Sequence, residues 1–212
     1  MRLLKLDHWA VRRAVREHNL NQYPRIGRGT FCAVYDKGDT VLKLTCDEKA
    51  YWFVRDMQDA GPWFPRLIAD HHKVAAMGER DVYLIEVEKL TRIRANSKPW
   101  KRVVELGDKL HTQYKSFHNK ADLTELDRHR YASVHAFYRM ADDDTLDEDT
   151  QEAFGRVAQW MSNYECGHDF SAQNVMLRGT QLVFNDVIAD TASLLKAGKE
   201  YADQQRRLRY MR

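Results

Sequence analysis

The start of the chain combines one amphipathic helix with short β-favouring runs. Residues 3–20 place apolar side chains at helical spacing and most arginines elsewhere, which predicts a helix with one apolar face. Residues 26–35 and 40–45 favour β-structure, and the turn Lys37-Gly38-Asp39 lies between them. We therefore expect a β-hairpin soon after the first helix.

A second helix and a second hairpin follow. Asp47 predicts the N-cap of a helix that runs to about Asp59, and Gly61-Pro62 ends it. Residues 73–77 and 82–87 are two further β-favouring runs around a turn. The first ninety residues are thus predicted to be rich in strands.

The second half of the chain changes to helical patterns. Residues 100–118, 124–140 and 150–165 mix polar and apolar positions without an internal proline, and each predicts a helix. A small hairpin is predicted at 175–177 and 182–185, and the tail after it is predicted to be helical. The order of strands first and helices second indicates the α+β class.

Composition narrows the class of protein. Hydrophobic residues occupy 43% of the 212 positions, which is enough for a core, and no apolar run approaches the roughly 20 residues of a membrane helix. The charged start argues against a secretion signal, and three cysteines without a CxxC pair fit a reducing cytoplasm. We therefore expect a cytoplasmic protein with no membrane partner.

The net charge of +3 conceals two basic ends. The first 20 residues carry five basic and two acidic side chains, and the last 20 carry six and two. Basic ends can contact nucleic acid or an acidic protein surface, and the tail with Arg206, Arg207 and Arg209 is the stronger candidate. A solvated helix face is an equally good interpretation of each end.

Two features of the strand-rich half suggest phosphate binding. The segment Gly27-Arg28-Gly29-Thr30-Phe31-Cys32-Ala33-Val34 places paired glycines where the backbone could approach a polyphosphate, although a plain turn explains them too. Lys43 lies in an apolar strand and is expected to project opposite Leu42 and Leu44. Its ammonium could meet phosphate oxygens there, or lie in solvent at a sheet edge.

The most specific pattern lies near the end of the helical half. Asp169 precedes Asn174 by five positions, and Asp186 follows Asn174 by twelve, after the predicted hairpin. A loop and a short hairpin would bring these three side chains together. Two carboxylates and an amide oxygen suit Mg²⁺, which prefers hard oxygen ligands and commonly shares them with a substrate phosphate.

Taken together, these features resemble the eukaryotic-like protein kinase fold. Gly27-x-Gly29-x-Phe31-x-x-Val34 is similar to the glycine-rich loop, and Lys43 to the third-strand lysine. Asp169 with Asn174 looks like the catalytic loop, and Asp186 looks like the metal-binding aspartate. The closest similarity is to the early Ser/Thr protein kinases of short-tailed lytic bacteriophages, which share the Asp-x-x-x-x-Asn-[Ile/Val]-Met segment and a basic tail.

This resemblance implies a bilobal kinase-like fold of the α+β class. A small β-rich N-lobe would span residues 1–90, and a truncated, mainly helical C-lobe would span residues 91–212. ATP and Mg²⁺ would be the cofactors. The protein would be phage-encoded and would phosphorylate Ser and Thr of host proteins in the bacterial cytoplasm, with RNA polymerase as one target.

The matching positions imply roles in nucleotide binding. Gly27, Gly29, Thr30 and Phe31 would cover the phosphates, and Val34 would press on adenine. The backbone from Glu86 to Glu88 would be the hinge that bonds adenine.

The remaining positions imply roles in phosphoryl transfer. Lys43 would hold the α- and β-phosphates, with Glu48 as its carboxylate partner and Asp56 or Asp59 as the alternatives. Asp169 would accept or orient the proton of the acceptor hydroxyl. Asn174 and Asp186 would hold Mg²⁺.

Some positions depart from the kinase pattern. Cys32 replaces the third glycine, and His168 rather than arginine precedes Asp169, which argues against control by a phosphorylated activation loop. Asp186-Val187-Ile188 lacks the usual Phe-Gly, and little chain follows it to build a peptide-docking surface. A binding protein that inhibits a host enzyme through a kinase scaffold is therefore the alternative function. A small-molecule phosphotransferase ranks third.

Overall fold

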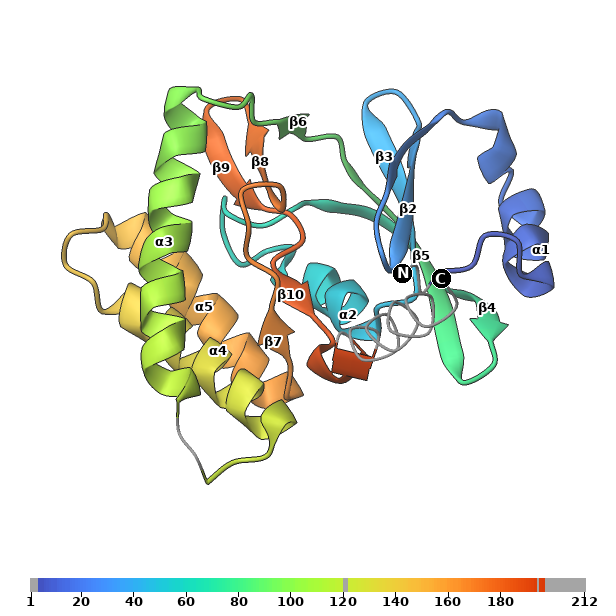
Figure 1. Cartoon of the computed structure of the whole chain (residues 1–212). Helices are drawn as coiled ribbons and strands as arrows, with labels where there is room; N and C mark the ends of the chain where they lie inside the picture. Colours follow the sequence, from blue (N-terminus) through green and yellow to red (C-terminus); the bar gives the residue numbers. More distant parts are fainter. Residues whose placement is uncertain (1–3, 120–121, 194, 197–212) are drawn as a thin grey trace, which may run out of the picture. The chain divides into compact units, whose positions relative to one another are not determined.

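The computed structural model of the chain describes residues 4–119, 122–193 and 195–196 (Figure 1). These residues form two compact units. The first contains residues 4–58, 65–89 and 196, and the second contains residues 59–64 and 90–195. The basic tail with its predicted helix, arginines and nucleic-acid contact lies outside the described residues.

A five-stranded antiparallel sheet in the order β1-β2-β3-β5-β4 forms the centre of the first unit. Its strands are β1 (Arg25–Arg28), β2 (Cys32–Asp36), β3 (Thr40–Thr45), β4 (Leu67–Met77) and β5 (Arg80–Glu88). Gly38 and Gly78 turn two of the hairpins with φ of 95° and 63°, a region that favours glycine. Both predicted hairpins are confirmed, and β4 is longer than predicted because three register shifts against β5 disguise its alternation.

Three helical segments belong to this unit: α1 (Trp9–Glu17), the 3₁₀ turn η1 (Leu20–Gln22) and α2 (Glu48–Met57). α2 begins where predicted, because the Asp47 carboxylate accepts the N–H of Ala50 at 3.0 Å. The first helix is shorter than predicted. It begins at Trp9 rather than residue 3, because the His8 ring caps it by accepting the N–H of Ala10 at 3.3 Å.

The two faces of the sheet belong to two different hydrophobic clusters. Leu42 and Leu44 of β3 pack in a cluster that includes Val11 of α1. On the other face, Ile85 of β5 packs in a cluster that includes Tyr51 of α2. Because side chains alternate along a strand, each residue of β3 and β5 is assigned to the α1 face or the α2 face by its position alone.

Three helices make up most of the second unit: α3 (Lys98–His118), α4 (Glu125–Ala141) and α5 (Glu148–Tyr164). Each starts at a residue whose side chain accepts a backbone N–H of the first turn, namely Ser97, Thr124 and Asp147. All three bounds agree with the predicted helices to within two residues. Mixed polar and apolar positions without an internal proline predicted these helices, and the structure shows which polar residues cap them.

Short strands complete the second unit. β6 (Thr91–Arg92), β8 (Val175–Arg178) and β9 (Gln181–Phe184) form an antiparallel sheet in the order β6-β8-β9, and β7 (Gly167–His168) pairs with β10 (Ile188–Ala189). The predicted β8–β9 hairpin is confirmed. Because β7 pairs with β10, the segment between them is a loop whose two ends are fixed side by side.

A cluster of phenylalanine rings joins this loop to the helices. Phe137 of α4 and Phe154 of α5 have ring centroids 5.2 Å apart, and Phe154 lies 5.3 Å from Phe184 of β9. Phe170 from the loop lies 5.4 Å from Phe184. Such tilted aromatic pairs bury large apolar areas, so the loop is anchored in the core. The α+β class, with a β-rich first unit and a mainly helical second unit, is confirmed.

No helix in the described part of the chain has the length and the apolar character that crossing a bilayer needs.

One ion pair fixes the hairpin between β2 and β3 to β5. The buried carboxylate of Glu86 accepts hydrogen bonds from Lys37 Nζ at 2.7 Å and from Thr40 Oγ1 at 2.5 Å. Burial raises the pKa of Glu86, but the hydrogen bonds from Lys37 and Thr40 outweigh it and hold the pKa below its ordinary 4.5. The folded state therefore favours the charged carboxylate.

We predict that Glu86→Gln lowers the free energy of unfolding at pH 7 by about 1–3 kcal/mol, because hydrogen bonds to a charged group are lost. The folded pKa lies below the unfolded one, so this stabilisation is complete above about pH 4.5 and is lost as the pH falls through the folded pKa. Urea unfolding at pH 7 and at pH 3 measures both effects. Glu152→Gln, which removes an exposed pair with Arg156, is the matched control and should change little.

Candidate functional site

The glycine-rich segment forms the β1–β2 hairpin and has no room for larger side chains. A Cβ on Gly27 would lie 3.3 Å from Val34 Cβ, and a Cβ on Gly29 would lie 3.2 Å from Cys32 Sγ. Gly29 N–H also donates to the Cys32 carbonyl at 2.9 Å. The two glycines therefore allow a tight hairpin, and Cys32, which stands where a third glycine was expected, helps to close it.

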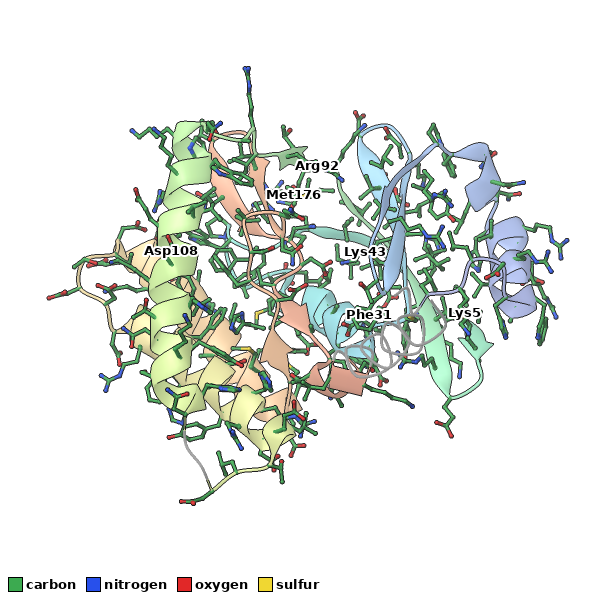
Figure 2. All side chains as sticks on the ribbon, in the orientation of Figure 1. Lys5, Phe31, Lys43, Arg92, Asp108 and Met176 are labelled. Carbon is green, nitrogen blue, oxygen red and sulfur yellow. The ribbon has the colours of Figure 1, made fainter. Side chains whose placement is uncertain are left out.

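The tip of this hairpin is tied to the α1 face of the sheet. The Thr30 carbonyl accepts the N–H of Leu4 at 3.1 Å, and the Phe31 carbonyl accepts the N–H of Cys46 at 2.9 Å. The Phe31 side chain packs against the hydrophobic cluster that contains Leu4 (Figure 2). In this conformation Phe31 contributes to the core, so covering of phosphates by Thr30 and Phe31 stays a prediction.

Lys43 lies in the middle of β3 and is only 7% exposed. It stands directly opposite Val34 on β2 and Ile85 on β5, and its neighbours Leu42 and Leu44 belong to the α1 face. Since residues opposite each other in an antiparallel pair share a face, Val34 and Lys43 both lie on the α2 face. The structure thus brings together the residues expected to contact adenine and phosphate.

Glu48 is the first residue of α2, and its carboxylate accepts hydrogen bonds from side chains of β5 and of α2 itself. Its Oε1 accepts a hydrogen bond from the Tyr83 hydroxyl at 3.0 Å and a longer one from Trp52 Nε1 at 3.4 Å. Burial and the Glu48 carboxylate both raise the pKa of Tyr83, so the hydroxyl stays protonated and keeps donating. Tyr83 is a positioning residue that the sequence did not reveal, and pairing of Glu48 with Lys43 stays a prediction.

A hydrogen bond and an ion pair also hold α2 to β4. The Tyr51 hydroxyl and the Arg55 guanidinium both reach the Asp70 carboxylate, at 3.0 Å each. The Tyr51 ring stacks on Tyr83 with centroids 4.1 Å apart. α2 is therefore held to β4 and β5 at several points, which fixes the position of Glu48.

The predicted hinge residues have partners within the first unit. The Glu86 side chain is on the α1 face, opposite Leu42, so it points away from Lys43. Glu88 N–H donates to the Arg66 carbonyl at 3.1 Å, and Glu88 Oε1 accepts the Arg66 N–H at 2.8 Å. The Glu86 side chain is structural, and adenine binding by the backbone of residues 86–88 stays a prediction.

In the second unit, backbone hydrogen bonds bring the three predicted site residues together. Asp169 N–H donates to the Val187 carbonyl at 2.8 Å, next to Asp186. The Asn174 carbonyl accepts the N–H groups of both Asn185 and Asp186, at 3.0 and 3.1 Å. The loop before β8 and the segment after β9 are thus joined at Asn174, which is the convergence that the spacing predicted.

The Asn174 side chain is oriented by Asp169. Its Nδ2 donates to Asp169 Oδ2 at 3.0 Å and to the Asp169 carbonyl at 2.6 Å. With its nitrogen committed to Asp169, the amide oxygen of Asn174 is the atom that could ligate a cation.

Two carboxylates repel each other in this group. Desolvation by the surrounding protein raises the pKa of Asp169, and the negative charge of Asp186 raises it further, although the Asn174 hydrogen bond lowers it. The Asp169 side chain nevertheless keeps access to solvent. A carboxylate of this kind accepts a proton more readily than an ordinary aspartate.

The donor set fits Mg²⁺ better than a metal held by protein alone. Among the described residues, no three His, Cys, Asp or Glu side chains gather where they could hold a metal. Asp186 and the Asn174 amide oxygen could supply two hard oxygen ligands, and Asp169 lies near enough to Asp186 for their charges to interact. Mg²⁺ commonly binds through one or two carboxylates plus substrate phosphates, and such a cation would relieve the repulsion.

The start of the loop depends on residues that the sequence did not reveal. Gly167 is enclosed so tightly that a Cβ there would overlap Thr191 Oγ1 and lie 3.3 Å from Ser133 Oγ. Ser133 of α4 also accepts the N–H of His168 at 3.4 Å. Gly167 immediately before His168 was the one available signal, because nothing in the sequence pointed to Ser133 or Thr191.

The half-buried ring of His168 supports the start of the loop that carries Asp169. Its Nδ1 accepts the N–H of Phe170 at 3.2 Å, and its ring lies 5.4 Å from the rings of both Tyr114 and Phe137. Burial is the main cause that lowers the pKa of His168 to about 4, with repulsion from His111 and His129 adding to it. At neutral pH the ring is therefore uncharged and acts as a hydrogen-bond acceptor.

No protein-family model matches this sequence, and no curated protein is similar to it. Among solved structures, the chain is similar to aminoglycoside phosphotransferase APH(4)-Ia, at 11% identity, a TM-score of 0.35 and coverage of 85% of this chain and 74% of that one. It is also similar to a thermostable mutant of that enzyme in ternary complex with AMP-PNP and hygromycin B, at 13% identity and a TM-score of 0.35, with 86% and 73% covered. Likenesses this distant carry no argument about activity.

We predict that His168 makes stability pH-dependent. Its folded pKa of about 4 lies below the ordinary 6.5, so its contribution is complete above about pH 6.5 and falls as the pH drops toward 4. Between pH 7.5 and pH 5 this costs about 2 kcal/mol. His168→Asn, whose Oδ1 can replace Nδ1 as the acceptor, should remove that loss, as measured by urea unfolding at both pH values. The exposed His111→Asn is the control and should retain most of the wild-type loss; equal losses in wild type and His168→Asn would contradict the prediction.

Proposed function

We propose that the chain is a Mg-ATP-dependent phosphotransferase of the kinase superfamily. The observation that carries the proposal is the convergence of Asp169, Asn174 and Asp186 through the backbone bonds at Asn174. In this proposal Asn174 and Asp186 hold Mg²⁺, and Lys43 binds the α- and β-phosphates of ATP. Mg²⁺ would supply charge neutralisation on the phosphates.

The electrostatics of the site support this assignment of roles. The arrangement brings two acidic side chains near each other. Desolvation and the negative charge of Asp186 both raise the pKa of Asp169, so the surroundings disfavour a charge on this carboxylate. A divalent cation together with a phosphorylated substrate makes the same arrangement favourable.

The proposed step is an in-line displacement. The oxygen of an acceptor hydroxyl forms a bond to the γ-phosphorus, and the bond from that phosphorus to the β,γ-bridging oxygen breaks, so that ADP leaves with the electron pair. The hydroxyl proton passes to a carboxylate oxygen of Asp169. Asn174 fixes the orientation of that carboxylate, and His168 and Phe170 anchor the loop on which it lies. Catalysis then comes mainly from positioning and charge neutralisation.

We propose Ser and Thr hydroxyls of proteins as the acceptors. The support is the resemblance to bacteriophage Ser/Thr kinases in the segment from Asp169 to Met176. In that case the substrates are host proteins, such as RNA polymerase, in a bacterial cytoplasm. A scaffold that binds and inhibits a host enzyme is the second candidate, and the absence of Phe-Gly after Asp186 favours it.

We predict that Asp186→Asn reduces phosphoryl transfer about 100-fold or more, because a carboxylate that holds Mg²⁺ is lost. The measurement is transfer of label from γ-labelled ATP with Mg²⁺ into bacterial lysate proteins and, separately, into a set of small hydroxyl compounds including aminoglycosides. Asp190→Asn is the matched control, since it removes a carboxylate four positions away that accepts hydrogen bonds from Ala192 N–H and Ser193 Oγ. It should retain transfer.

The outcomes separate the candidates. Labelled protein with wild type and not with Asp186→Asn supports the protein kinase. Label only in a small compound supports a phosphotransferase but contradicts protein substrates. Equal labelling by wild type and Asp186→Asn, or none by either, contradicts catalysis; host-enzyme inhibition retained by both would then establish the binding protein.

A further inference from the structure

The helix α1 has two faces of opposite character. Ala10, Val11 and Ala14 are buried, and Val11 belongs to the cluster on the α1 face of the sheet. The other side carries Trp9, Arg12, Arg13 and Arg16, which are all exposed. These four residues stand at i, i+3, i+4 and i+7, the spacing that places side chains in one stripe along a helix. We call them the Trp–Arg stripe.

Trp9 is the most exposed large hydrophobic residue among those described, at 67%. Its one ring contact in the described structure is with His8, at a centroid distance of 5.9 Å. The other tryptophans are buried or half-buried; Trp63 and Trp160 are each 4% exposed. Trp9 therefore gains little from burial of apolar surface, and its exposed ring offers a flat face on which another ring could stack.

Only one of the three arginines of the stripe forms an ion pair with a described acidic side chain. Arg13 forms an ion pair with Glu17 at 2.7 Å, which is exposed on both sides. Arg12 and Arg16 have no ion pair or hydrogen bond with any described side chain. They are four positions apart, so their Cβ atoms lie about 5–6 Å from each other on the helix surface. The stripe therefore presents two uncompensated guanidinium groups beside one exposed indole.

The surroundings of the stripe favour one class of partner. A membrane-surface helix needs a free apolar face, and the apolar face of α1 is already buried against the sheet. A standard protein interface needs about 800 Å² on each partner, which a stripe about 10 Å long does not supply. A single strand of nucleic acid needs only cations for its phosphates and an aromatic face for an unstacked base.

We propose that the Trp–Arg stripe of α1 binds single-stranded nucleic acid, with a base stacked on Trp9 and phosphates contacted by Arg12 and Arg16. Arg13, held by Glu17, is a weaker contributor. The binding needs no ATP, no Mg²⁺ and no residue of the second unit, so it is independent of the proposed phosphotransferase activity. It would give the protein an affinity for RNA or DNA strands at a surface separate from Lys43.

The test is fluorescence anisotropy of a labelled 12-nucleotide oligo-dT or oligo-U with the full chain at several salt concentrations. Trp9→Ala should weaken binding roughly 5- to 150-fold, the range expected for loss of one stacked base. Arg12→Gln with Arg16→Gln should weaken binding and make the slope of log affinity against log salt about 1.4 shallower, since two phosphate contacts are lost. Arg156→Gln, an exposed arginine on α5, is the matched control and should bind like wild type.

Two further measurements keep the proposal open to contradiction. Iodide quenching of tryptophan fluorescence should fall when the oligonucleotide is added to wild type and should not change with Trp9→Ala. Because the substituted side chains are exposed, circular dichroism should show that every variant is folded. Variants that bind like wild type, displacement of the oligonucleotide by polyglutamate at equal charge, or tighter binding of a duplex of the same length would each overturn the proposal.

Discussion

The site depends on one backbone junction, where the Asn174 carbonyl accepts the amides of Asn185 and Asp186. Two carboxylates would separate if their backbones were free to move, because repulsion between like charges rises steeply as they approach. Here the junction, the Asp169–Val187 bond and the β7–β10 pair hold the two backbone segments together. Phenylalanine packing behind the loop stabilises the same arrangement. The charge pattern of the site is therefore imposed by the fold.

Much of this arrangement could be predicted from the sequence, because its signals are local. The cap Asp47 acts within three residues, so the start of α2 was found at its true position. Turn glycines marked the hairpins, and the alternation around Lys43 assigned it to the face opposite Leu42. The spacing from Asp169 to Asp186 predicted that these residues lie close together, because the hairpin between them reverses the direction of the chain.

The features that could not be predicted are those in which distant segments meet. Tyr83 and Glu48 are 35 positions apart, and Ser133 and His168 are also 35 apart, so no local sequence pattern indicates either hydrogen bond. Because β4 pairs irregularly with β5, the first half of β4 lacks regular alternation and was not predicted as a strand. The packing of the Phe31 ring against the apolar cluster around Leu4 also joins distant segments, and no local pattern indicated it.

Hydrogen exchange at the Leu4 amide would report on the hairpin tip, because this amide donates to the Thr30 carbonyl. The Leu4 amide is sheltered only while the hairpin tip keeps its present conformation, and it is buried with its side chain in the same cluster. Its deuterium uptake would thus follow the opening of a loop that lies some 26 positions further along the chain. Exchange of the Leu4 amide proton would therefore measure how often the tip of the β1–β2 hairpin separates from the cluster that contains Leu4.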